Sequence, residues 1–153
     1  RGNGFAAIGL TETLSVLPED HPERPSILKS YRRLLEGLKS YQQPSGRWLE
    51  IIDLKGSYEE MTGTCMIGYA VARGLRKGWI DSSNMEWVNK IWVGASERIA
   101  DNGDVMDGCI STGAMESIRD YLDRTAVCGY DDRTGSLALW FAVEMSRLLE
   151  GRK

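Results

Sequence analysis

Histidine is almost absent from this sequence, because His21 is the only one among 153 residues and it lies in a short turn before Pro22. That scarcity excludes Ser-His-Asp and Cys-His catalysis and removes most zinc sites. The three cysteines are widely spaced without a CxxC pair, so we expect free buried thiols rather than disulfides. The stretch RGNG lacks the glycine spacing of a dinucleotide-binding loop. We predict no metal site and no cofactor.

Excess positive charge and long apolar runs are missing as well. The 19 Lys and Arg residues stand against 22 Asp and Glu residues, for a net charge of −3. No basic surface is expected for phosphate backbones, so we predict no nucleic-acid partner. No apolar run approaches the roughly 20 residues of a membrane span, so we expect no membrane partner.

The sequence does contain five helical patterns of two alternating kinds. They cover residues 5–17, 26–41, 61–75, 84–99 and 136–149. The first, third and fifth are nearly free of charge, whereas the second and fourth carry one apolar stripe and a charged opposite face. A helix that is apolar all round is buried on most sides, and a striped helix covers a surface. The alternation predicts an all-α toroid of helical hairpins with inner and outer layers, in preference to a four-helix bundle or an open solenoid.

The connections between these helices differ in length. Those from outer to inner helices are long and polar, as in QQPSGRWLEIIDLKGSYEE, where RWLEII is compatible with a short strand. Those from inner to outer helices are short. Function is therefore expected at the end of the molecule that carries the long connections.

Each inner helix begins with small residues, in GNGF, MTGTC and RTGSL. If the inner helices are parallel, these segments meet at one mouth, where helix N-termini favour a carboxylate. Simple capping and close helix packing is the alternative. Arg1 lies at this mouth and suits a carboxylate or vicinal hydroxyls, or else an acidic neighbour. Trp48 suits either stacking on a sugar ring or filling the core beneath its loop. Phe5 either forms the floor of the same site or simply packs against its neighbours.

Acidic residues offer weaker candidates. Asp101, Asp104 and Asp107 do not match the alternating ligand positions of a calcium loop, so we interpret DNGDVMDG as a polar turn. The pairs Glu59–Glu60 and Asp131–Asp132 precede inner helices, where they either cap the helix or hold substrate hydroxyls.

Three motifs in this order carry a family resemblance: RGNGF, SGRWLEIIDLKGSYEEMTGTCMIGYAVARGLRKGWI and YLDRTAVCGYDDRTGSLALWFAVEM. They resemble the C-terminal part of the unsaturated rhamnogalacturonyl hydrolases, which are related to the unsaturated glucuronyl hydrolases. The family pattern reads W-G-R-G-N-G-W, then G-x-W, then an acidic segment before the last helix. The resemblance implies an (α/α)6 barrel of which residues 1–153 supply about half, as the C-terminal portion of a single domain.

The resemblance also implies a reaction. The family hydrolyses oligosaccharides that carry a 4,5-unsaturated uronic acid at the non-reducing end, such as products of rhamnogalacturonan lyases. An aspartate protonates the C4=C5 vinyl ether and helps water to attack C5, so the chemistry is hydration rather than displacement between two carboxylates. By this resemblance Arg1, Phe5 and Trp48 are substrate-binding residues, with Phe5 in place of the family's tryptophan.

The family's catalytic aspartate lies upstream of R-G-N-G, so the resemblance implies no catalytic residue within 1–153. We expect these residues alone to be inactive and to associate with the N-terminal half of the barrel or with themselves. A cytoplasmic location is expected in preference to a secreted or periplasmic one. The competing interpretation is a non-catalytic helical-hairpin scaffold that binds a carbohydrate or a protein.

Overall fold

The protein is described from a computed structural model that covers residues 1–111 and 113–151. Its helices are α1 (Gly2–Val16), α2 (Arg24–Lys39), α3 (Met61–Arg76), α4 (Met85–Ser96), α5 (Ile118–Leu122) and α6 (Asp132–Glu150), with a 3-10 turn η1 (Ser82–Asn84) before α4. Four short strands are β1 (Trp48–Leu49), β2 (Glu59–Glu60), β3 (Val105–Cys109) and β4 (Ala126–Gly129). The five expected helices are all present, each within a few residues of the expected bounds.

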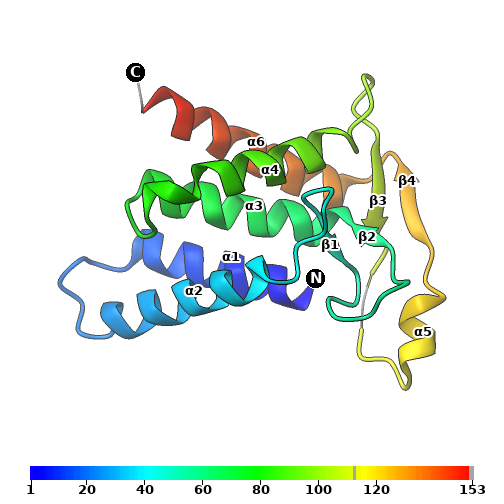
Figure 1. The fold of residues 1–153 in the computed structure, drawn as a ribbon, viewed down its shortest axis with the longest axis horizontal. Coiled ribbons are helices and arrows are strands. Elements are labelled where there is room, and N and C mark those ends of the chain that lie inside the picture. Colours follow the sequence, from blue (N-terminus) through cyan, green and yellow to red (C-terminus); the bar gives the residue numbers. More distant parts are fainter. Residues whose placement is uncertain (112, 152–153) are drawn as a thin grey trace.

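The helices form the two layers that the alternating patterns predict. α3 packs against α1 on one side and α6 on the other, so these three apolar helices lie side by side. The amphipathic α2 and α4 cover α1 and α3 respectively (Figure 1). α3 is buried along almost its whole length, as its nearly uncharged sequence requires. The inner/outer interpretation is therefore confirmed.

The central position of α3 leaves no space beside Gly68. A Cβ at this position would approach Ile91 of α4 to 2.9 Å and would overlap the ring of Phe141 in α6. Gly9 of α1 has the same helical backbone, but a Cβ there would meet nothing within 4 Å. The two glycines thus form a matched pair that differs only in packing.

Replacing Gly68 by alanine is expected to lower the free energy of unfolding by about 1–3 kcal/mol, because the core must open to admit a methyl group. Gly9→Ala should instead be neutral or stabilising by up to about 1 kcal/mol, since alanine favours the helix. Urea unfolding of both variants checks the pair. Equal midpoints for the two variants would contradict this packing.

The long connections lie at one end, where the inner helices begin, and the short turns lie at the other (Figure 1). The first long connection holds the antiparallel pair β1–β2, with Trp48 opposite Glu60. The second holds β3–β4 and α5, which the sequence had not predicted beyond a polar turn. The pairing of β3 with β4 shifts register between Val105 and Gly108, and Asp107 has a positive φ of 59°.

Candidate functional site at the start of the inner helices

The starts of α1, α3 and α6 meet at a single place, as the three small-residue segments predicted. A Cβ on Gly4 would lie 3.2 Å from the Cα of Gly63, so glycine permits the close approach of α1 and α3. The hydroxyl oxygens of Thr62 in α3 and Thr134 in α6 are 3.1 Å apart. Residues distant in sequence are thereby held at one mouth.

Glu60 is the best-connected acidic group at this mouth, and it is only 2% exposed. Its carboxylate accepts hydrogen bonds from the backbone N–H of Thr62 at 2.6 Å and of Gly63 at 2.5 Å, so it caps α3. It also accepts the N–H of Cys109 in β3 at 3.0 Å. Glu60 therefore fixes the edge of β3 to the start of α3.

Asp131 has the same role at the start of α6. Its carboxylate accepts the backbone N–H of Thr134 at 2.9 Å and the hydroxyl of the same residue at 2.5 Å. Capping hydrogen bonds of Thr134 contribute to holding the pKa of Asp131 below its usual range, although partial burial opposes them. The capping alternative for Glu60 and Asp131 is thus the one that the structure favours. Two of the three helix starts already face a carboxylate of the protein itself.

The start of α1 differs from the other two. Within the described residues, no side chain caps it, and its first turn contains no acidic residue. Arg1 occupies the N-cap position, and its guanidinium lies over the ring of Phe5, with Cζ 5.4 Å from the ring centroid. A positive helix end and a guanidinium therefore coincide at this one point, which is suited to an anion.

Arg1 has few partners among the described residues. Its Nη1 donates to Sγ of Cys109 at 3.5 Å, while its Nε is buried without a hydrogen bond. The thiol of Cys109 in turn donates to a carboxylate oxygen of Glu50 at 3.5 Å. The other oxygen of Glu50 accepts the hydroxyl of Tyr58 at 3.4 Å. These contacts hold the guanidinium on one side. They leave other N–H groups of Arg1 to donate hydrogen bonds to a ligand.

Tyr58 stays protonated in this setting. Burial is the largest cause that raises its pKa, and the carboxylates of Glu50 and Glu60 raise it further. Its hydroxyl is therefore a hydrogen-bond donor at neutral pH. Sequence reasoning missed Glu50, Tyr58 and Cys109, because no spacing signal brings β3 to the first long connection; only the fold does so.

Phe5 and Trp48 lie in different environments. Phe5 is 54% exposed beside Arg1, where a ligand can reach it. Trp48 is 3% exposed, its indole N–H donates to the carbonyl of Leu38 at 2.7 Å, and its ring packs edge-on against Trp87. This position corresponds to the core-plug alternative for Trp48. A direct contact of Trp48 with sugar stays a prediction, as does that of Arg1 and Phe5.

Other chemistry finds little support in the described part of the chain. No group of three His, Cys, Asp or Glu side chains is placed there to hold a metal ion. Across the same residues, no helix has the length and apolar character needed to cross a membrane. His21 lies in the turn between α1 and α2, where its Nδ1 accepts the N–H of Glu23.

Glu60 gives the site a pH-dependent contribution to stability. Burial is the main cause that raises its pKa above the ordinary value of 4.5, outweighing the hydrogen bonds from Thr62 and Gly63 and the nearby positive charge at the amino group of Arg1, which lower it. Between 4.5 and the raised value, the native state binds more protons here than the unfolded chain does, so the free energy of unfolding falls as pH rises.

Glu60→Gln cannot titrate at this position, so its stability should lack this pH dependence. We expect the stability difference, wild type minus Glu60→Gln, to decrease as pH rises above 4.5. Urea unfolding of both proteins across that range measures the difference. A difference that increases with pH would show that the folded-state pKa of Glu60 is depressed.

The amino-acid sequence is similar to a known protein family and to curated proteins. The family model described as "Glycosyl Hydrolase Family 88" matches residues 1–149. A curated relative, "Unsaturated 3S-rhamnoglycuronyl hydrolase" of Alteromonas sp. (strain LOR), is 30% identical over 108 residues, which are 69% of this chain and 26% of that protein. The chain therefore spans about a quarter of that relative's length.

Solved structures are similar in fold. One is described as a possible member of family GH105 from Salmonella enterica serovar Paratyphi A, with a TM-score of 0.84 and 20% identity over 95% of this chain and 38% of that one. Another, a family 105 glycoside hydrolase from C. acetobutylicum, has a TM-score of 0.82 and 22% identity over 96% of this chain and 44% of that one. The chain thus forms part of an (α/α)6 barrel, which confirms the expected fold class.

Proposed function

Because the chain belongs to glycosyl hydrolase family 88, we propose that it supplies the carboxylate-binding side of an active site for unsaturated oligosaccharides. The substrate carries a 4,5-unsaturated uronic acid at its non-reducing end, as in products of rhamnogalacturonan or related lyases. The observation that carries the proposal is the position of Arg1, whose guanidinium coincides with the one inner-helix start that lacks a capping carboxylate among the described residues.

In this proposal Arg1 binds and orients the uronate. The substrate carboxylate is attached to C5, the carbon that water attacks, so holding that group fixes the vinyl ether relative to the catalytic acid. Phe5 packs against the ring beside the guanidinium. Cys109 of β3 contacts the guanidinium directly, and Glu50, which follows β1, accepts from the thiol of Cys109. The general acid comes from outside residues 1–153.

The reaction is hydration. A proton is added to C4, the hydroxyl of water bonds to C5, and the remaining proton of that water returns to the catalytic group. The resulting hemiketal opens and releases the remaining sugar. Within this scheme Arg1, Phe5 and Glu50 perform no proton transfer; they set the position of the ring.

The test is the ultraviolet absorbance of the C4=C5 double bond, followed in a protein that contains the complete barrel. An unsaturated uronyl disaccharide should lose this absorbance, and the release of its second sugar should match that loss. Binding of the disaccharide without loss of absorbance would overturn the hydrolase and support the scaffold alternative.

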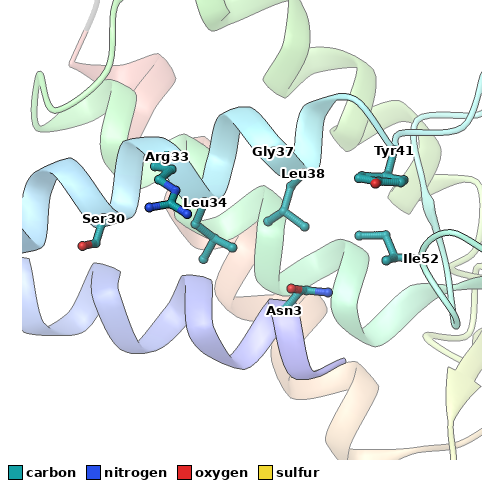
Figure 2. A pocket seen from close by; sticks show the side chains of 8 residues that line it. All are labelled: Asn3, Ser30, Arg33, Leu34, Gly37, Leu38, Tyr41 and Ile52. Atoms are coloured by element: carbon teal, nitrogen blue, oxygen red, sulfur yellow. The ribbon is translucent and has the colours of Figure 1, made fainter.

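We further propose that the remaining helices of the barrel pack along the groove between α1 and α2. Figure 2 shows side chains that line this groove, with Asn3 from α1 on one side and Leu34 and Leu38 from α2 on the other. The groove has a volume of about 500 Å³. Val16 at the end of α1 is 81% exposed, which adds apolar surface to the same helix. The alternative occupant is a second copy of the chain.

Size-exclusion chromatography distinguishes the states. Residues 1–153 alone should run as an oligomer or aggregate, whereas a protein with the complete barrel should not. A monodisperse monomer of residues 1–153 would contradict the proposed packing.

We also propose a cytoplasmic location, with the exposed free thiol of Cys128 as support, since such thiols persist in reducing compartments. Cell fractionation that finds the protein outside the cytoplasm would overturn this.

A further inference from the structure

Cys109 is the residue of β3 that lies beside the guanidinium of Arg1. It is 2% exposed, and its sulfur accepts a hydrogen bond from Nη1 of Arg1 at 3.5 Å. Among the described residues, no other polar side chain forms a hydrogen bond with this guanidinium, which otherwise lies over the ring of Phe5. The direction of the guanidinium therefore depends on the position of one thiol.

The backbone of Cys109 is held by the starts of two inner helices. Its N–H donates to Oε1 of Glu60 at 3.0 Å and to the hydroxyl oxygen of Thr62 at 3.1 Å. The hydroxyl of Thr134 donates to Asp131 at 2.5 Å, so in the 3.1 Å contact between the two threonines the donor is Thr62. A directed chain of hydrogen bonds thus runs from the N–H of Cys109 through α3 to the carboxylate that caps α6.

The thiol of Cys109 is oriented as well, because its hydrogen has a defined acceptor. A guanidinium group has only donors, so the sulfur accepts from Arg1 and its S–H donates to Oε1 of Glu50, 3.5 Å away. The other oxygen of Glu50 accepts the hydroxyl of Tyr58 at 3.4 Å. The sulfur therefore bridges the guanidinium and an anchored carboxylate.

A sulfur at this place holds the guanidinium without neutralising it. A carboxylate in direct contact would form a bidentate pair, occupy two N–H groups and compete with a ligand for the positive charge. A thiol is a weak acceptor, and it takes only one of the five N–H groups. The charge of Arg1 therefore stays available for the carboxylate of a ligand, in a direction that Cys109 sets.

We infer that Cys109 is a positioning residue, which aims the guanidinium of Arg1 at the uronate carboxylate of the substrate. The inference rests on the proposed function for its ligand. It adds a residue of the second long connection to a site in which Arg1 and Phe5 come from the start of α1. Cys109 performs no proton transfer and acts through Arg1.

The test compares kcat/KM for an unsaturated uronyl disaccharide and for its methyl ester in a protein with the complete barrel. Cys109→Val and Cys109→Ala both remove the acceptor for Arg1 and the donor to Glu50, one filling the space of the thiol and one leaving it empty. Each should lower the acid-to-ester ratio about fivefold. Cys109→Ser keeps both functions on a shorter bond and should lower the ratio less. Cys128→Val replaces an exposed thiol of the paired strand β4 and should leave the ratio unchanged.

Both substrates are compared on the same sample, so a loss of folded protein cancels in the ratio, and a merely structural role of Cys109 leaves it unchanged. A wild-type ratio in Cys109→Val and Cys109→Ala, or a ratio in Cys109→Ser as low as in these two, would overturn the inference. In Arg1→Ala, the added Cys109→Val should not change the ratio further. A further change would show that Cys109 acts on the substrate without Arg1, which also overturns it.

A measurement without substrate separates this inference from the proposed function. The heteronuclear NOE of the Nε–H group of Arg1 should fall in Cys109→Val, because the side chain gains motion, and should stay at the wild-type value in Cys128→Val. An unchanged NOE in Cys109→Val would overturn the positioning role even where wild type hydrolyses the substrate. Failure of the proposed function would instead appear as no loss of absorbance with wild type.

Discussion

Replacing Arg1 by alanine is expected to lower kcat/KM for an unsaturated uronyl disaccharide by about 100-fold or more in a protein with the complete barrel. Loss of one partner of a desolvated, hydrogen-bonded charge pair typically costs about 2–5 kcal/mol. Arg1 is the N-cap residue of α1, and within the described residues no side chain caps the start of that helix. The substrate would lose its cation at the helix end.

Arg1→Lys provides the matched comparison. Lysine keeps the charge but cannot donate a bidentate pair of hydrogen bonds, so an intermediate loss is expected. Steady-state kinetics gives the ratio, and circular dichroism checks the fold of each variant. Unchanged turnover in a folded Arg1→Ala protein would remove Arg1 from the site and favour a scaffold.

Replacing Glu60 by alanine is expected to destabilise the protein by about 3 kcal/mol or more. The substitution removes the acceptor of three backbone N–H groups, those of Thr62, Gly63 and Cys109, at a position that is 2% exposed. The amides of Thr62 and Gly63 would be left without a partner at about 1–3 kcal/mol each, whereas the amide of Cys109 keeps the hydroxyl oxygen of Thr62 as an acceptor at 3.1 Å. The contributions are not additive. The start of α3 and the edge of β3 should loosen together.

Urea unfolding measures this loss, and Glu36→Ala on the exposed face of α2 is the control, with an expected change below about 0.5 kcal/mol. Hydrogen exchange at the amide of Cys109 should also become faster in Glu60→Ala. A loss of stability as small as that of the control would show that Glu60 does not connect the two elements.

The helices were predictable because their stripes and caps are local signals. The alternation of uncharged and striped segments predicted the layers, and the small residues at the helix starts predicted their convergence at one mouth. α6 begins at Asp132 rather than near residue 136, because the carboxylate of Asp131 caps it and draws Thr134 into the first turn. From the sequence, capping by Asp131–Asp132 was one of two alternatives, the other being contact with substrate hydroxyls.

The second long connection was not predictable in the same way. The sequence of β3 shows no clear apolar alternation. In the structure, the register of β3 shifts between Val105 and Gly108. Asp107 adopts a positive φ, and its carboxylate pairs with Arg98. The neighbours of Arg1 depend on this strand. Cys109 is held beside the guanidinium by the pairing of β3 and by the hydrogen bonds from its N–H to Glu60 and Thr62.

Trp48 illustrates a different limit. The sequence left stacking and core packing equally open, because a tryptophan after glycine and arginine in a polar connection fits both. Burial decides the environment: Leu38 accepts its N–H and Trp87 packs against its ring, and neither contact follows from local spacing.

The most direct test of a carboxylate site at Arg1 compares two ligands in two proteins with the complete barrel. The ligands are an unsaturated uronyl disaccharide and its methyl ester, and the proteins are wild type and Arg1→Ala. Steady-state kinetics should find kcat/KM for the ester about tenfold or more below that for the acid in wild type, with no difference between them in Arg1→Ala. Equal kcat/KM of wild type for acid and ester would contradict the account.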